Sequence, residues 1–428
     1  MKSTKLIFIS FLLLPLFFIS CEETINNYDK SIIITDSLRW DNYDDLVKVV
    51  SDVPAGILTY SELEKIPRGT IMKLRVNRED FEVWEVYVVF DAVYRENNER
   101  LILCHTPSIF PIGSGDSGSP LLTTDGKVVG ILCYGYSGNS NDFIARAVED
   151  VLNIQNNNSS QSSNSALHDL VSPVFYVSGF NKQAAERYPS LNNLFKDFTI
   201  IKNEPINSSK QLYKTSNEIT IPGSSISVSY ITGDYITASA IGTLSFIKEE
   251  LLFAFGHDFH PFTAAPTFLA STKSFIKSSN ISFKMSEPTT QFIGSFVKND
   301  FNGILINKFT TPQVADIQTN CSYKGKSVFS YNHKLSISPD IDFDKTLATD
   351  LSCYLIYLNA LIPNNIQNKQ LSANCNLEII TEKEIRKITF SVNGSGIDWA
   401  IYNYITSNVD LIIAENKIKS YSLSVELY

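Results

Sequence analysis

The sequence predicts a mostly β protein with two β barrels followed by a C-terminal β-rich accessory domain. Three observations support this fold class. Short apolar runs of strand length, separated by turn residues, recur from about residue 44 to the C-terminus. A polar low-complexity segment at 155–165 divides two such regions. A hydrophobic content of 43%, with 12% aromatic residues, is ample for buried cores.

Residues 1–20 are predicted to be a signal peptide rather than part of the fold. Lys2 and Lys5 precede an apolar run at 6–19 that is short for a membrane anchor and ends at Cys21. This pattern resembles the bacterial lipoprotein signal, which implies cleavage before Cys21 and lipidation of that residue. An ordinary secretory signal is the alternative. Residues 21–43 would then be a polar tether, and several acyl chains on Cys21 would anchor the protein stably in the bacterial cell envelope. The outer membrane is the expected location, with the body on its periplasmic or surface side.

The net charge and the cysteine pattern argue against a nucleic-acid partner, a disulfide framework and a metal site. A net charge of −9 without a concentrated basic patch argues against a nucleic-acid partner. Apart from Cys21, five cysteines remain, without a C-x-x-C pair, so neither a complete disulfide framework nor a metal site is indicated. No cofactor is expected. Cys104 and Cys133 could pair with each other or pack singly, and packing is favoured because buried free cysteine behaves as a small hydrophobe.

The first barrel is predicted at 44–154. The run 81–90 alternates at its start and is continuously apolar at its end, as in a strand that passes from barrel rim to core. Further strands are expected at 54–60, 101–104, 121–122 and 128–132.

The remaining chain divides into three parts. Residues 155–218 are predicted to be a linker and bridging segment, with helix-like composition at 181–195 despite Pro189. The second barrel is predicted at 219–309. Residues 310–428 continue with alternating strands and one helix near 398–407, which gives the C-terminal accessory domain.

A loop at 111–120 stands out within the first barrel. It contains the string Gly-Asp-Ser-Gly-Ser-Pro at 115–120, with strand signals on both sides. Gly115 and Gly118 allow the backbone to curl so that N–H groups converge on one point. Ser117 would then be a nucleophile, with the N–H groups of Gly115 and Ser117 as oxyanion donors. The alternative is a Gly/Ser-rich hairpin loop without chemistry.

A serine nucleophile needs a base, and histidine is the usual one. Among five histidines, His257 follows an apolar strand and a glycine, which would bring it to a barrel rim. His260 is a weaker candidate in the same turn. His105, beside a Thr-Pro turn, is expected to be structural, whereas His168 and His333 lie in polar surroundings and are expected at the surface.

The motifs resemble the SpoIVB peptidase family of bacterial serine peptidases, which have a chymotrypsin-like two-barrel fold. The resemblance rests on the strings at 115–120 and 254–257, with supporting blocks at 242–244 and 282–284, and covers 45–305 in scattered blocks. It implies that Ser117 is the nucleophile and His257 the base. In that family the histidine block precedes the serine block and a PDZ module accompanies them. Here the order is permuted and no PDZ pattern is found, but catalytic triads are defined by geometry rather than by chain order.

The acid of a triad is assigned by spacing. Asp300 lies 43 residues after His257 in the same predicted barrel, which resembles the His-to-Asp spacing of chymotrypsin-like barrels. Asp234 and Asp91 are alternatives. Asp258 would diverge from its neighbour His257, and Asp116 is expected to point away from the histidine.

The sequence therefore predicts a membrane-anchored serine endopeptidase that hydrolyses a protein or peptide substrate through a Ser117–His257–Asp300 site. The alternative function is that of a catalytically inactive lipoprotein of the same fold that binds a protein or a glycan.

Overall fold

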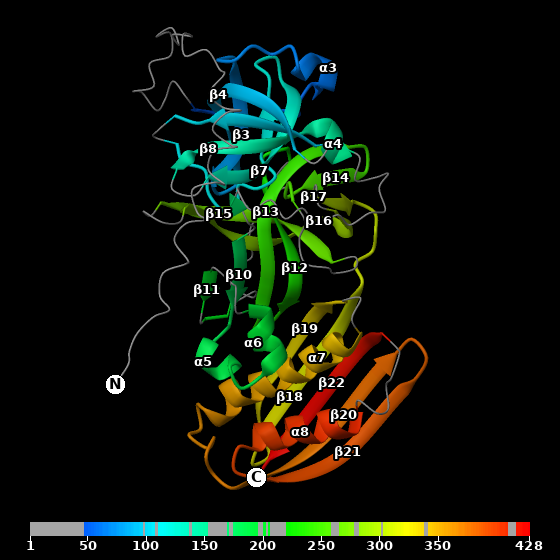
Figure 1. Cartoon of the computed structure of the whole chain (residues 1–428). Helices are drawn as coiled ribbons and strands as arrows, with labels where there is room; N and C mark the ends of the chain where they lie inside the picture. Colours follow the sequence, from blue (N-terminus) through cyan, green and yellow to red (C-terminus); the bar gives the residue numbers. More distant parts are fainter. Residues whose placement is uncertain are drawn as a thin grey trace, which may run out of the picture. The chain divides into compact units, whose positions relative to one another are not determined.

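A computed structural model of the chain describes residues 47–428 apart from internal gaps, and Tyr43–Tyr428 is one compact unit (Figure 1). The gaps are 97–98, 108–109, 137–138, 153–168, 171–173, 196–199, 203, 206–219, 258–264, 278–281, 301–302, 338–340 and 410–416. The predicted signal, the tether with Cys21 and the low-complexity linker thus lie outside the described residues, as do His168, His260 and Asp258.

The first barrel is a closed ring of six antiparallel strands. Its order is β4, β3, β6, β7, β8, β5 and back to β4. The strands are β3 (Ile71–Glu79), β4 (Glu82–Glu96), β5 (Glu99–His105), β6 (Pro120–Leu122), β7 (Lys127–Tyr136) and β8 (Asn139–Ala147). Smaller elements adjoin them: β1 (Val47–Val50), β2 (Gly56–Ile57), α3 (Tyr60–Leu63), α4 (Val148–Leu152) and β9 (Asp169–Leu170). Closure leaves no free sheet edge in this ring.

Alternation along the strands fills the barrel interior. On β3, Met72, Leu74 and Val76 are completely buried, and they pack with Val86 of β4 and Ile102 of β5. The apolar residues follow the period of two of a strand, while Arg75 and Asn77 between and after them are buried on its other face. The predicted mostly β class with a barrel is therefore confirmed.

The second barrel is also a ring of six antiparallel strands, closed by the pairing of β12 with β13. Its order is β13, β14, β17, β16, β15, β12 and back to β13. The strands are β12 (Ser225–Gly233), β13 (Thr237–Lys248), β14 (Leu251–Ala254), β15 (Pro266–Lys277), β16 (Ser282–Asp300) and β17 (Gly303–Asn307). Their bounds fall within the range 219–309 expected from the sequence.

The chain between the barrels adds to the second sheet. β10 (Val174–Ser178) pairs with β13, and β11 (Ile200–Lys202) pairs with β10. The helix-like stretch forms two short helices, α5 (Lys182–Ala185) and α6 (Pro189–Phe195). Pro189 therefore begins a helix, where its missing N–H costs nothing, and does not interrupt one.

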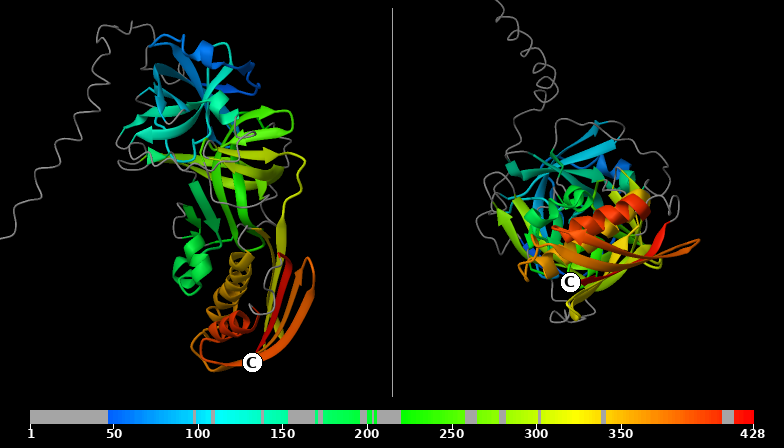
Figure 2. Two further views of the ribbon diagram at one scale, coloured as in Figure 1. Left: turned by 45° about the vertical axis from the view of Figure 1, so that its right-hand side comes forward. Right: turned by 90° about the horizontal axis from the view of Figure 1, so that it is seen from below.

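The C-terminal region continues the second sheet. β19 (Lys326–Ser336) pairs with β12, followed in order by β18 (Val314–Tyr323), β22 (Ile418–Leu427), β20 (Leu371–Thr381) and β21 (Ile385–Gly394). The helices α7 (Ile341–Ile356), with its extension η2 (Tyr357–Leu361), and α8 (Ile397–Val409) lie together on one side of this sheet (Figures 1 and 2). One apolar core runs from the second barrel through the helices into the C-terminal sheet.

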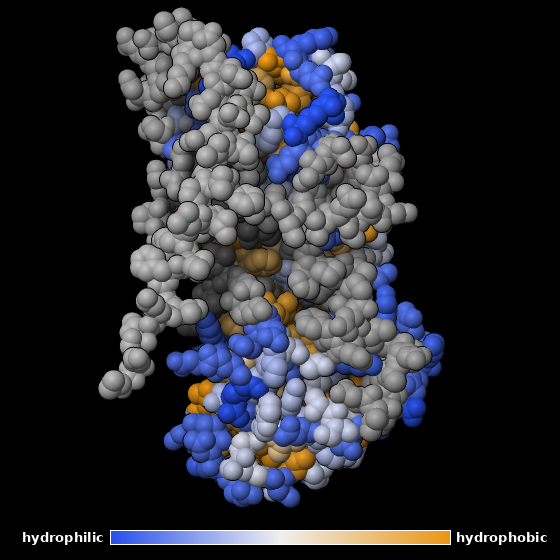
Figure 3. Space-filling view, viewed as in Figure 1, coloured by the Kyte–Doolittle hydropathy of each residue, from blue (hydrophilic) through white to orange (hydrophobic). Residues whose placement is uncertain are grey.

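The helix expected near 398–407 is confirmed as α8, but α7 was not predicted from the sequence. Residues 344–356 are buried almost without interruption, and the buried side chains include the polar ones of Asp344, Lys345, Thr349, Asp350 and Ser352. The other side of the sheet is polar at alternate positions, such as Gln318 and Asn320 of β18. In Figure 3 the surface over the C-terminal elements is mainly hydrophilic, with separate small hydrophobic areas.

Candidate active site

The serine loop (113–119) connects β5 to β6 in the first barrel. Gly115 and Gly118 have φ of 88° and 93°, in the left-handed region that favours glycine. The Gly118 N–H donates to the Leu132 carbonyl at 2.9 Å, and the Leu132 N–H donates to the Ser119 carbonyl at 2.9 Å. These bonds fix the loop on β7. Ser117, between the two glycines, is completely buried.

The histidine turn (254–257) begins where β14 ends in the second barrel. Phe255 and Gly256 both adopt left-handed backbone, with φ of 72° and 65°. For a bulky residue such as Phe255 this conformation is strained, and strain of this kind is concentrated at functional sites. His257 follows directly and is 2% exposed.

The structure brings the serine loop and the histidine turn into direct contact. The Ser117 hydroxyl donates a hydrogen bond to the Phe255 carbonyl, two residues before His257. The Ser117 carbonyl accepts from the Thr243 N–H at 3.0 Å, and the Thr243 carbonyl accepts from the Phe255 N–H at 3.2 Å. Within the described part of the chain the Ser117 hydroxyl is therefore bonded to this carbonyl and not to the His257 imidazole.

Glycines make this approach possible. A Cβ on Gly118 would collide with the Thr243 carbonyl oxygen and lie 2.6 Å from the Phe255 nitrogen. A Cβ on Gly256 would collide with the Leu132 carbonyl oxygen. The two loops thus meet backbone to backbone, and a side chain at either glycine would separate them.

The predicted oxyanion donors are the N–H groups of Gly115 and Ser117. Among the described residues, neither the Gly115 nor the Ser117 N–H donates to another protein group. Gly115 and Gly118, the left-handed residues on either side of Ser117, shape the backbone that carries both N–H groups.

Asp116 is held by a buried ion pair. Both of its carboxylate oxygens accept from Arg78 of β3, the second at 2.8 Å, and one also accepts from the Gly113 N–H at 3.0 Å. The Arg78 guanidinium lies over the rings of Phe110 and Phe275. Asp116 therefore supports the base of the serine loop.

A second cation supports the serine loop from the other barrel. Lys284 of β16 is completely buried, and its ammonium donates to the Thr243 hydroxyl at 2.9 Å. That hydroxyl donates to the Gly115 carbonyl at 2.9 Å. Burial lowers the pKa of Lys284 to about 7; the nearby Asp116 opposes this shift, and Arg78 adds to it.

The histidine turn has a matching support from the first barrel. Arg146 of β8 is completely buried and donates through Nη1 to the Gly256 carbonyl at 2.8 Å. Its Nε donates to Glu99 at 3.1 Å. A cation of each barrel therefore reaches the loop that the other barrel carries.

The candidates for the acid lie in three different places. Asp300 is the last residue of β16, where it pairs with Gly303, and the neighbouring Ile304 pairs with Ala254 at the end of β14. The backbone of Asp300 is thus at the same end of the second barrel as the histidine turn, while its side chain lies outside the description. Asp234 instead accepts from the Asn332 N–H at 2.8 Å, beside β19.

Two other histidines have structural partners. The His105 Nδ1 is 2.7 Å from the Asp91 carboxylate, and this hydrogen bond raises the pKa of His105. The expectation that His333 lies at the surface is wrong, because it is 2% exposed. Its Nε2 accepts the N–H groups of Tyr235 and Ile236, and burial lowers its pKa to about 4. Successive side chains of a strand point to opposite faces, so a residue in a polar stretch can still face the core.

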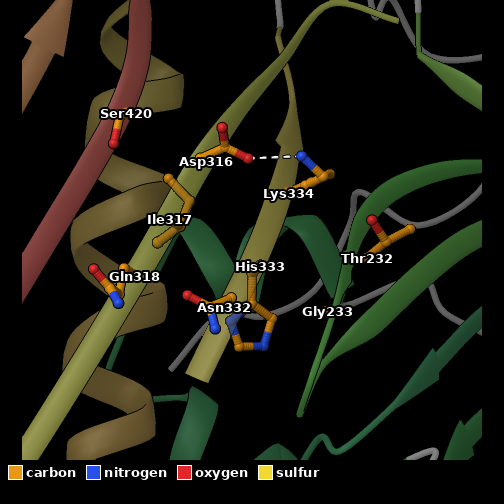
Figure 4. Close-up of a pocket in the computed structure, with 9 residues that line it drawn as sticks. All are labelled: Thr232, Gly233, Asp316, Ile317, Gln318, Asn332, His333, Lys334 and Ser420. Carbon is orange, nitrogen blue, oxygen red and sulfur yellow. Dashed lines mark hydrogen bonds and ion pairs between the residues drawn. The ribbon is translucent and has the colours of Figure 1, made fainter. Parts of the chain in front are cut away.

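A hollow of about 440 Å³ lies where β12 approaches the C-terminal sheet (Figure 4). His333 lines it, and Asp316 and Lys334 form an ion pair of 2.7 Å on its wall. None of the predicted catalytic residues lines this hollow, so it is separate from the contact between the serine loop and the histidine turn.

The remaining expectations concern cysteines, metals and membranes. Cys104 and Cys133 are buried and free, as expected, and so are Cys321, Cys353 and Cys375. The described residues contain no group of side chains arranged to hold a metal ion. Over the same residues, every helix is too short or too polar to cross a membrane.

The residues that sequence reasoning left without a role are Arg78, Arg146, Thr243 and Lys284. Thr243 and Lys284 lie in two of the blocks that carry the family resemblance, so a signal for them was present without a stated role. No protein-family model and no curated protein matches the sequence.

Proposed function

We propose that this protein is a serine endopeptidase of the SpoIVB peptidase type, anchored in the bacterial cell envelope through lipidated Cys21. The observation that carries the proposal is the hydrogen bond from the Ser117 hydroxyl to the Phe255 carbonyl, two residues before His257. It joins two motifs that are 138 residues apart and that belong to two closed barrels.

The proposed reaction is acyl transfer from a protein or peptide substrate. Rotation about the Cα–Cβ bond takes the Ser117 hydroxyl off the Phe255 carbonyl into another staggered rotamer. His257 accepts the hydroxyl proton while the oxygen attacks the scissile carbonyl, and later gives the proton to the leaving amine. The N–H groups of Gly115 and Ser117 bind the oxyanion, and Asp300 orients the imidazole. Water then attacks the acyl group on Ser117, with His257 accepting the water proton and returning it to the Ser117 oxygen, and the acid product is released.

A fluorophosphonate probe tests the proposal on the full-length protein in detergent. We expect wild type to be labelled at Ser117, and Ser117→Ala to lose both labelling and hydrolysis of a peptide library. Ser119→Ala is the matched control, because this buried hydroxyl of the same loop has no hydrogen-bond partner among the described residues. If folded wild type is not labelled, or if Ser117→Ala hydrolyses peptides as well as wild type does, the proposal is wrong.

A second candidate function is binding without catalysis. The observation that favours it is that Ser117 is completely buried and already bonded to a backbone carbonyl. A protein that folds, resists the probe and retains a protein or glycan ligand would support this candidate. The lipid anchor is tested separately: release of Cys21→Ser from the membrane fraction supports it, and retention contradicts it.

A further inference from the structure

We propose that Lys284 is a positioning residue whose protonation locks the serine loop through Thr243, so that the second barrel controls the geometry of the nucleophile carried by the first. This inference rests on the proposed function for its meaning. We call the chain of hydrogen bonds from Lys284 through Thr243 to the Gly115 carbonyl the lock. The lock can be measured without any activity.

The lock depends on the direction of two hydrogen bonds. A lysine ammonium has three donors and no acceptor, so the Thr243 hydroxyl must accept from Lys284. The single hydrogen of that hydroxyl then points to the Gly115 carbonyl, which it reaches at 2.9 Å. The protonated lysine therefore fixes which way the threonine donates, and the threonine fixes the Gly115 peptide beside the nucleophile.

A neutral amine would not enforce this order. It has a lone pair and can accept the Thr243 hydrogen, which would then leave the Gly115 carbonyl. That carbonyl belongs to the residue whose own N–H is a proposed oxyanion donor. A neutral amine can still donate to Thr243, so loss of the Lys284 proton removes the constraint on which way the Thr243 hydroxyl donates, and the bond to the Gly115 carbonyl is then no longer enforced.

The surroundings of Lys284 place this change near neutral pH. Lys284 is completely buried, and burial disfavours its charged form. Two charged groups face it, Asp116 of the serine loop and Arg78 of β3, and they act in opposite directions. On the neighbouring strand β13 the uncharged Thr243 accepts from Lys284, and Val174 of β10 lies beside Gly115.

Backbone hydrogen bonds also join the serine loop to β16. The Lys284 N–H donates to the Ser114 carbonyl at 2.8 Å, and the Ser114 N–H donates to the Ser282 carbonyl at 2.8 Å. The serine loop thus already lies along β16. The Lys284 side chain therefore acts on a segment to which the Lys284 backbone is already hydrogen-bonded.

Hydrogen exchange of the full-length protein tests the lock directly. At pH 6 we expect Lys284→Met to lower the protection of amides in 113–119 by about tenfold, the effect of losing one charge-assisted hydrogen bond. At pH 8 wild type and Lys284→Met should differ little. Lys273→Met, which removes a partly exposed lysine of β15, is the matched control and should match wild type at both pH values.

Thr243→Val gives a second route if Lys284→Met does not fold. It removes the hydroxyl at similar volume, so protection of 113–119 should be low at both pH values. Equal protection in wild type and Thr243→Val at pH 6 would overturn the inference, as would a Lys284→Met effect of the same size at pH 6 and pH 8.

Activity separates this inference from the proposed function. If wild type hydrolyses peptides, its kcat/KM should fall above pH 7 as Lys284 loses its proton, and Lys284→Met should lack that alkaline fall. An active enzyme with the same alkaline fall in both proteins would contradict the lock alone. An inactive wild type that shows the exchange pattern would contradict the proposed function alone.

Discussion

The serine loop and the histidine turn are in contact, but they hold their shapes in different ways. The serine loop uses Gly115 and Gly118 at its left-handed positions, where glycine is not strained. The histidine turn places Phe255 in the left-handed region, where a bulky side chain is strained. A turn that keeps such strain must be held by its surroundings, and here the Arg146 bond to the Gly256 carbonyl helps to hold it.

Arg146 and Lys284, the cations that support the two loops, differ in whether their charge can change near neutral pH. Arg146 keeps its charge throughout the range in which proteins are stable, whereas a buried lysine can lose its proton near neutrality. Under the proposed function, the base would be carried on a fixed turn and the nucleophile on an adjustable loop. Three predictions test how far this difference extends.

The largest expected effect concerns Asp300, the proposed acid of the Ser117–His257 site. Asp300→Asn should lower kcat by about 10³–10⁴-fold, since loss of the acid leaves the imidazole in the wrong tautomer. Asp91→Asn is the control, because Asp91 is bonded to His105 on the first barrel and should not affect the rate. Steady-state kinetics with one peptide substrate compares the two variants. A large loss in Asp91→Asn with none in Asp300→Asn would reverse the assignment.

The next effect concerns the close approach of the two loops. Gly118→Ala and Gly256→Ala should each lower the free energy of unfolding by about 3 kcal/mol, the sum of left-handed strain and overpacking against backbone. Gly325→Ala isolates the strain, because its φ is 75° and nothing lies within 4 Å of a Cβ there. It should cost about 1 kcal/mol. Equal losses at all three glycines, measured by denaturant unfolding, would show that the loops are not closely packed.

These glycines also show what a sequence can and cannot reveal. Gly115, Ser117 and Gly118 form a local string, and His257 ends an apolar strand, so both loops could be proposed from neighbouring residues. The barrels followed from period-two alternation. The contact between the loops could not be predicted, because it depends on how two barrels pack across 138 residues.

The cations were hidden for a related reason. Arg146 lies 110 residues from Gly256, and each buried cation occupies a strand position that, by alternation alone, could equally face solvent. Nothing local distinguishes an inward lysine from an outward one. α7 was not expected because its charged residues, Asp344, Lys345 and Asp350, are buried by tertiary packing and do not mark a solvent-facing stripe.

The smallest effect compares the two cations through the pH dependence of stability. The ordinary pKa of lysine is 10.5, and that of folded Lys284 is about 7, so between these values the unfolded chain binds more protons than the folded one. Stability contributed by this group therefore rises with pH, by about 1 kcal/mol per pH unit just above pH 7. Protonation of Lys284 therefore lowers the free energy of unfolding, although the charged side chain is the form that fixes the direction of the Thr243 hydrogen bond.

Denaturant unfolding at pH 7, 8 and 9 measures this difference. Lys284→Met removes the titrating group, so wild type should gain stability relative to this variant as the pH rises. Arg146→Met removes a cation that does not titrate in this range, so its difference from wild type should stay constant. Other titrating groups cancel in both comparisons. A constant difference for Lys284→Met would mean that both cations are permanent charges, and the adjustable character of the serine loop would then have to come from its glycines alone.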